Sequence, residues 1–238
     1  MKPAGTFDRA VALKGQVTGP ITLIFQLFAG EQSLITHQDL ANTLGRYSTS
    51  LALWQANHLR RNQGTVLMFV DEPCLGFLKP NLAPATRAYL LRVLKELLVG
   101  LRVAGVVTGL HCCAYPSLAI LNEVQPDIFS FDAFEGLEAF CASPEAKLFL
   151  EHGGQVAFGL IPTSRNLSAF HPEMQFYRWT LAAEPLPDLG ELARRSLVTA
   201  TCGLGLLDEP AARTSFQATH HLSRFFKLAV PDLLYHHI

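Results

Sequence analysis

The chain has 238 residues, of which 49% are hydrophobic and 16% charged, and its 19 Lys and Arg against 20 Asp and Glu give a net charge of −1. This balance excludes a nucleic-acid binder, which needs clustered basic residues, and the apolar content excludes a disordered chain. No apolar run reaches the ~18–20 residues that span a bilayer, and the first ten residues lack the apolar core of a signal peptide. Five cysteines are too few, and odd in number, for a disulfide scaffold. We therefore expect a cytoplasmic, enzyme-sized globular protein without a membrane partner.

The apolar pattern predicts six strands in chain order. They cover residues 11–13 continuing through 16–18, then 65–70, 106–110, 128–131, 156–161 and 197–201. Helical patterns between and after them cover residues 36–62, 85–101, 116–123, 135–150, 188–195 and 210–227. The first of these helices has apolar residues at helical spacing, namely Leu40, Leu44, Tyr47, Leu51, Trp54 and Leu59. The stretch before residue 188, with three prolines, is expected to be irregular.

The alternation of strands and helices predicts an α/β fold. Both faces of each strand are apolar, which is typical of parallel strands covered by helices. No G-x-G-x-x-G sequence follows a strand, which disfavours a dinucleotide-binding sheet. Residues capable of chemistry follow the strands repeatedly, and a (β/α)8 barrel places its chemistry at the carboxyl ends of its strands. We therefore predict a (β/α)8 TIM-barrel fold, although only six of eight strand–helix units are present.

His111 and Cys113 form a His-x-Cys sequence directly after a predicted strand. An imidazole and a thiolate two residues apart can converge on a zinc ion at a strand-to-loop turn. The alternative is that His111 caps the loop, and that Cys112 and Cys113 are small buried residues.

Cys202 ends another predicted strand and precedes Gly203, where the backbone can approach a metal closely. In a barrel, Cys202 would join His111 and Cys113 at one mouth, and Asp132, after the intervening strand, would supply a carboxylate oxygen. Two thiolates, one imidazole and an exchangeable ligand describe a catalytic zinc site. The remaining cysteines, Cys74 and Cys141, are expected in the core or in loops.

Asp71 and Glu72 end a further strand, in the sequence Asp-Glu-Pro. A carboxylate at a barrel mouth binds a substrate ammonium group or acts in acid–base chemistry. The alternatives are an N-cap of the next segment or a salt bridge in the barrel rim. Thr163, also at a strand end, is expected to line the substrate site.

Four sequence segments occur in a characteristic order. They are residues 14–22 (KGQVTGPIT), 70–73 (VDEP), His111 with Cys113, and 202–204 (CGL). This series resembles the catalytic domain of cobalamin-independent methionine synthase, within the larger group that contains uroporphyrinogen decarboxylases and corrinoid-linked zinc methyltransferases. The resemblance extends from about residue 11 to residue 228.

The resemblance implies a (β/α)8 barrel with zinc held by His111, Cys113, Cys202 and a carboxylate. The family's carboxylate ligand is a glutamate, and Asp132 stands at the matching place. Asp71 matches the aspartate that holds the amino group of homocysteine. The implied activity is a zinc-dependent transfer of a methyl group to a thiol such as homocysteine, in methionine synthesis, with zinc activating the thiolate.

The chain departs from the family in three respects. Two βα units that precede residue 14 in the family are missing, so we expect an N-terminally incomplete barrel over residues 1–238. The missing units predict self-association or a partner chain that completes the barrel, because six strands cannot close an eight-stranded barrel. Neither Trp54 nor Trp179 is at the position of the family's folate-stacking tryptophan, and no histidine follows the strand 156–161 in the family's register.

These departures leave the methyl donor open between methyl-folate and a methyl-corrinoid protein. A corrinoid-protein-dependent thiol methyltransferase is therefore one alternative function. A uroporphyrinogen decarboxylase relative needs arginines at the site, whereas the arginines here fall mostly on predicted helices. The third alternative is an inactive, truncated barrel that retains a metal.

Overall fold

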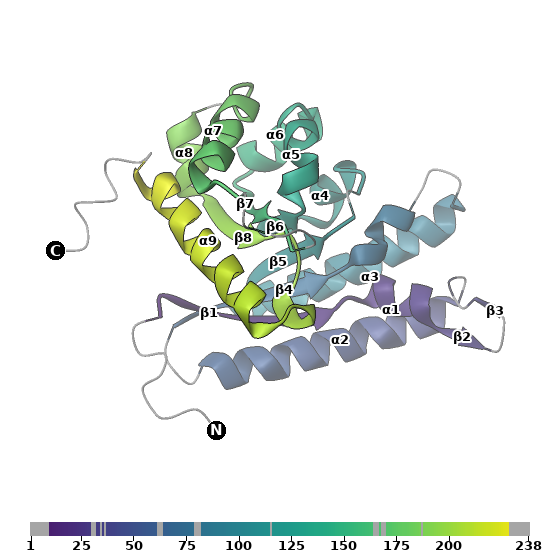
Figure 1. Ribbon diagram of the computed structural model, residues 1–238. Coiled ribbons are helices and arrows are strands. Elements are labelled where there is room, and N and C mark those ends of the chain that lie inside the picture. Colours follow the sequence, from purple (N-terminus) through teal and green to yellow (C-terminus); the bar gives the residue numbers. More distant parts are fainter. Residues whose placement is uncertain are drawn as a thin grey trace. The chain divides into compact units, whose positions relative to one another are not determined.

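The computed structural model describes residues 10–29, 32–33, 35, 37–60, 64–78, 82–114, 116–163, 167, 170–186 and 188–228. The chain divides into two compact units, Met1–Ile128 (unit 1) and Phe129–Ile238 (unit 2). Strands and helices alternate along both units, so the protein belongs to the α/β class, as the sequence predicts (Figure 1). All six predicted strands are present, with bounds within two residues of the prediction.

Unit 1 is built on three neighbouring strands in the order β1-β4-β5. These are β1 (Ala12–Thr18), β4 (Thr65–Asp71) and β5 (Val107–Cys112). Both pairings are parallel, as predicted from strands that are apolar on both faces. A separate antiparallel pair, β2 (Phe28–Ala29) and β3 (Gln32–Ser33), was not predicted.

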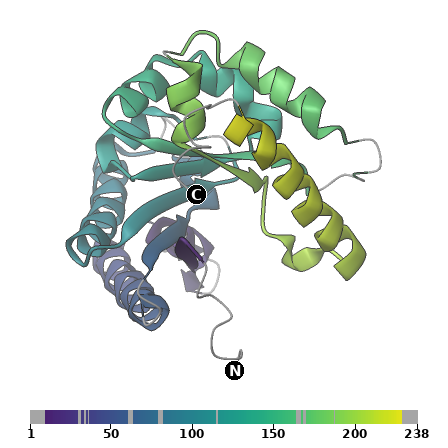
Figure 2. The same cartoon turned by 90° about the vertical axis from the view of Figure 1, so that its left-hand side faces the viewer.

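The helices of unit 1 follow its strands. They are α1 (Pro20–Gln26), α2 (Gln38–Leu59), α3 (Pro84–Val103) and α4 (Ala119–Val124), with a 3-10 helix η2 at Pro73–Phe77. The two long helices, drawn in blue, lie side by side in Figure 2. α3 buries large residues, including Leu90, Leu94, Leu97, Leu98 and Leu101, and so supplies a large apolar surface to the core of unit 1.

α2 packs through small side chains, whereas α3 packs through large ones. Its buried residues are all small, namely Ala41, Gly45, Ser48, Ala52 and Ala56. Gly45 is required there because a Cβ would overlap the Val93 side chain of α3. The large apolar residues that mark this helix in the sequence are half-buried or exposed, and Trp54 keeps 66% of its surface exposed.

Unit 2 contains the strands β7 (Gln155–Ile161) and β8 (Ser196–Ala200), which pair in parallel. β6 (Ile128–Phe131), which begins on the last residue of unit 1, precedes β7 in the strand order. The helices are α5 (Ala133–Cys141), α6 (Pro144–Glu151), α7 (Pro172–Ala182), α8 (Leu189–Arg194) and α9 (Glu209–Leu228), with η4 at Leu204–Leu206.

The core of unit 2 is aromatic. The rings of Phe131 and Phe140 are stacked with centroids 4.8 Å apart, and Phe158 meets Trp179 edge-on at 6.0 Å. Phe226 of α9 lies 4.5 Å from the same tryptophan. Such ring pairs add to the burial term, so this cluster joins β6, β7, α5, α7 and α9 into one unit.

Two predictions about helices in unit 2 are wrong. The expected helix over residues 135–150 is two helices, because Ser143 caps α6 and Pro144 occupies its first turn. Proline in a helix interior removes a hydrogen bond and clashes with the preceding turn, so the break is required. The stretch expected to be irregular contains α7, which likewise begins at a proline, Pro172.

Candidate functional site

Two predicted site residues, Asp71 and His111, lie side by side at the carboxyl ends of the strands of unit 1. The register pairs Thr18 with Asp71 and Asp71 with His111. In parallel strands, paired residues share a face, so the Asp71 and His111 side chains belong to the same side of the sheet. The register of β4 and β5 therefore places these two residues next to each other.

Asp71 is half-buried and shares its environment with Lys14 of β1. Loss of hydration raises the pKa of Asp71, and the Lys14 ammonium opposes this rise. The pKa of Lys14 is lowered by the same desolvation, opposed by Asp71. The Lys14 ammonium donates to Gln16 Oε1 at 2.7 Å and lies 4.8 Å above the Phe69 ring. The face that carries Asp71 is thus polar and charged.

Gly109 of β5 makes room for the Phe69 ring. A Cβ at this position would lie 2.5 Å from the ring, so any side chain would displace it. Lys14 and Gly109 both contact Phe69, which gives the lysine a fixed aromatic platform. Sequence reasoning passed over both Lys14 and Gly109, although Lys14 opens the KGQVTGPIT segment.

Glu72 is fully buried and is bound to the start of α1. Its carboxylate accepts hydrogen bonds from the Ile21 amide (2.9 Å), the Thr22 amide (2.7 Å) and the Thr22 hydroxyl (2.7 Å). Burial raises the pKa of Glu72 to about 7, and these hydrogen bonds counteract the rise. The prediction that Glu72 binds substrate remains a prediction. In this structure the carboxylate joins β4 to α1.

Backbone hydrogen bonds complete this link. The Gly19 amide donates to Asp71 O at 2.9 Å, and the Glu72 amide donates to His111 O at 2.8 Å. Gly19 is tightly enclosed, since a Cβ there would overlap the Glu72 carboxylate. The TGPIT and DEP segments, 50 residues apart, are therefore two halves of one network. The sequence signal for it was the polar Thr22, two residues after Gly19-Pro20.

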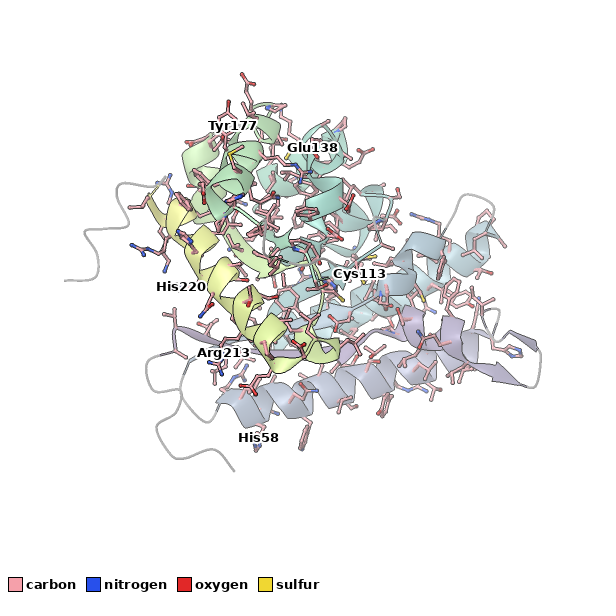
Figure 3. All side chains as sticks on the ribbon, in the orientation of Figure 1. His58, Cys113, Glu138, Tyr177, Arg213 and His220 are labelled. Atoms are coloured by element: carbon pink, nitrogen blue, oxygen red, sulfur yellow. The ribbon has the colours of Figure 1, made fainter. Side chains whose placement is uncertain are left out.

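The three residues at the end of β5 have different exposures. His111 is half-buried, Cys112 is fully buried and Cys113, which is labelled in Figure 3, is exposed. The Cys112 thiol donates to Ala114 O at 2.6 Å, and burial raises its pKa to about 12. Cys112 is therefore a core thiol, as the sequence alternative proposed for it, while Cys113 is accessible. His111 and Cys113 are the metal-ligand candidates of unit 1.

In unit 2, Cys202 follows β8 and is exposed. A Cβ on Gly203 or Gly205 would meet nothing within 4 Å, so the backbone around this cysteine is open. Just before it, Thr201 is buried, and its hydroxyl accepts from the Thr163 amide at 3.2 Å. Thr163 also lines a pocket of about 280 Å³ with Pro162, Leu167, Leu207, Ala211, Thr214 and Ser215.

Asp132 has a structural role within unit 2. It is the N-cap of α5, and its Oδ1 accepts from the Phe134 amide (3.0 Å) and the Glu135 amide (3.1 Å). This is a common role for an aspartate before a helix. Cys74 and Cys141 are buried, as expected, and desolvation raises the pKa of each thiol.

Comparison with known proteins adds no assignment, since no family model and no curated protein matches the chain. Within the described residues, no helix combines the length and apolar character that crossing a membrane requires. The proposed function therefore rests on the site residues of each unit.

Proposed function

We propose that the chain is a zinc-dependent methyltransferase that transfers a methyl group to a thiol such as homocysteine, on a barrel-type α/β fold. The observation that carries the proposal is the alignment of Asp71 with His111, followed by an accessible Cys113, at the ends of parallel strands. It supports a carboxylate for a substrate ammonium group beside ligands for a metal that activates the substrate thiol.

The proposed ligands are His111 and Cys113 of unit 1 and Cys202 of unit 2. One imidazole and two thiolates are donors that zinc prefers, and they leave one tetrahedral position for an exchangeable ligand. Both cysteines are exposed, whereas the other three cysteines are buried with raised thiol pKa values. A zinc ion, when bound, would lower the pKa of a substrate thiol so that it reacts as the thiolate.

The remaining residues would orient the substrate. Asp71 is held at its strand end because its carbonyl accepts from Gly19 and the next amide bonds to His111 O. Its carboxylate would bind the ammonium group of an amino-acid thiol. Glu72 would keep α1 and the ends of β4 and β5 in fixed positions, which lowers the entropic cost of aligning thiol and donor.

A methyl-corrinoid protein is the donor we would test first, because neither tryptophan of the chain matches the family's folate-stacking tryptophan. The chain has two. Trp179 is 1% exposed inside the aromatic core of unit 2. Trp54 lies on α2 and stacks on His58 with centroids 5.9 Å apart. A folate ring that needs to stack on tryptophan therefore has no evident partner among these two.

The proposal is tested by zinc content and methyl transfer in a set of cysteine variants. We expect one zinc per purified wild-type chain and transfer from methylcobalamin to homocysteine, faster than from methyl-tetrahydrofolate. Cys113→Ser and Cys202→Ser should each lose both zinc and transfer. Cys112→Ala and Cys141→Ala, which change buried thiols, are the matched controls and should retain both.

Zinc without transfer from either donor would contradict the methyltransferase proposal and leave a metal-binding protein. A Cys202→Ser variant that keeps stoichiometric zinc and full activity would remove Cys202 from the ligand set.

A further inference from the structure

One side of α2 carries a continuous row of large side chains. Counting from Leu40, the row advances by four and three residues in turn, and all its members fall within about 80° around the helix axis. We call it the α2 stripe: Leu40, Leu44, Tyr47, Leu51, Trp54 and His58. Tyr47 and Trp54 keep 59% and 66% of their surface exposed, and the three leucines are half-buried.

The rest of unit 1 holds α2 by other faces. Gly45 packs on Val93 of α3, and Ser48 and Gln55 contact β1. Ala41, Ala52 and Ala56 complete this buried face of small residues. The stripe lies to one side of it, and His58 points away from the strands of unit 1 (Figure 3). The largest side chains of α2 are thus not those that attach it to its own unit.

The free edge of β1 does not favour the addition of another strand. β1 ends the strand order, so one of its edges has no neighbouring strand within the described residues. α2 side chains already occupy two of its carbonyls, since Ser48 Oγ donates to Thr18 O at 3.2 Å and Gln55 Nε2 donates to Gln16 O at 3.1 Å. Blunting an edge in this way disfavours an added strand. A helix on the stripe is the better match.

The 4-3-4-3-4 spacing is that of a coiled-coil seam, and it reads the same in both directions. Two copies of α2 packed antiparallel would set Trp54 against Leu44 and Tyr47 against Leu51 of the second copy. The two ends would pair Leu40 with His58. Each large aromatic residue therefore meets a leucine, which is the self-complementarity that a two-fold interface requires.

Charge favours the same arrangement. Antiparallel packing sets the two helix dipoles against each other, whereas parallel packing brings like ends together. The net charge of −1 gives little general repulsion between copies.

We propose that the α2 stripe is the interface of a two-fold homodimer in which the two α2 helices pack antiparallel. The stripe from residue 40 to 58 is about 27 Å long. A single helix pair of this length buries less than the ~1,600 Å² of a standard interface, so the dimer is reversible and its population depends on concentration. This proposal does not depend on the proposed function.

Sedimentation velocity over a range of concentrations tests the interface. We expect a monomer–dimer equilibrium in the wild-type chain that Trp54→Glu and Tyr47→Glu each shift at least tenfold toward monomer. Arg46→Glu, at an exposed site of α2 that lies about 80° around the helix axis from the nearest stripe residue, is the matched control and should dimerise like the wild type. Circular dichroism melts confirm that each variant folds. Trp54 fluorescence should be quenched less by acrylamide as the dimer forms, against the constant signal of buried Trp179.

The direction of packing has its own test. Leu44→Glu and Trp54→Lys alone should each give monomers, whereas the double variant should regain the dimer, because antiparallel packing places each glutamate opposite a lysine. A wild-type chain that stays monomeric, or a dimer that survives Trp54→Glu, would overturn the proposal. A double variant that remains monomeric would overturn the antiparallel arrangement.

Discussion

Unit 1 and unit 2 fix their strand ends by different means. In unit 1, the buried Glu72 carboxylate takes three hydrogen bonds from α1, and backbone bonds join Gly19, Asp71 and His111. In unit 2, the aromatic cluster around Trp179 holds the elements together, and the open segment at Cys202 follows Thr201, which is hydrogen-bonded to Thr163 and Ile161. Strands and their helices can therefore be held in place either by a polar network or by packed aromatic rings.

The largest loss of stability should come from a change in the aromatic cluster of unit 2. Trp179→Ala removes a side chain that is 1% exposed and in contact with Phe158 and Phe226. We expect a loss of about 3–5 kcal/mol in the free energy of unfolding, measured with urea. Tyr177→Ala, on the same helix with 58% of the residue exposed, is the control. A loss below about 1 kcal/mol for Trp179→Ala would show that the cluster does not hold unit 2.

The polar network should contribute less, because its hydrogen bonds replace bonds to water. Glu72→Gln keeps the size of the side chain but sets an amide group against three donors. We expect a loss of about 1–3 kcal/mol in urea unfolding. The control is Glu123→Gln, whose exposed ion pair with Arg87 should be worth at most about 1 kcal/mol. Equal losses in the two variants would mean that the network is not a structural anchor.

The pH dependence of stability tests the contribution of Glu72 to the same network. Burial raises the pKa of Glu72 from 4.5 to about 7, so the folded chain holds this proton more tightly than the unfolded chain does. Its contribution to stability is therefore complete below pH 4.5 and is lost as the pH rises to about 7. Urea unfolding of the wild type against Glu72→Gln should show this loss only in the wild type. A difference between them that stays constant over this range would contradict the assignment.

A smaller loss of stability should come from removing a helix cap, and the zinc content then distinguishes capping by Asp132 from metal binding. Asp132→Ala removes the N-cap of α5 and should cost about 0.5–2 kcal/mol, as Ser143→Ala should at α6. Zinc content should not change in either variant, because the proposed ligands are His111, Cys113 and Cys202. Loss of zinc in Asp132→Ala alone would return Asp132 to the ligand set.

The sequence predicted the six strands because their apolar runs are short and end at polar or glycine-containing segments. It missed the break at Pro144 because apolar residues are frequent on both sides of it. In α2, hydrophobic periodicity marks Leu44 and Trp54, whereas the side that packs on the rest of unit 1 carries Gly45 and Ala52.

Only part of the candidate site could be predicted from the sequence. Residues such as Asp71, His111 and Cys113 stand directly after strands, and a local pattern can indicate them. The Glu72 network joins segments 50 residues apart, and only the strand register brings them together. Asp132 is a helix cap in the structure, and a cap and a metal ligand share the same sequence position at a strand end.

The proposed function requires one zinc ion bound by an imidazole and two cysteine thiolates. Zinc-edge X-ray absorption of the purified chain measures these ligands. We expect two sulfur ligands at about 2.3 Å in the wild type, with nitrogen or oxygen in the remaining positions, and one sulfur fewer in Cys113→Ser or Cys202→Ser if any zinc remains. A chain without zinc, or zinc bound by oxygen and nitrogen alone, would contradict it.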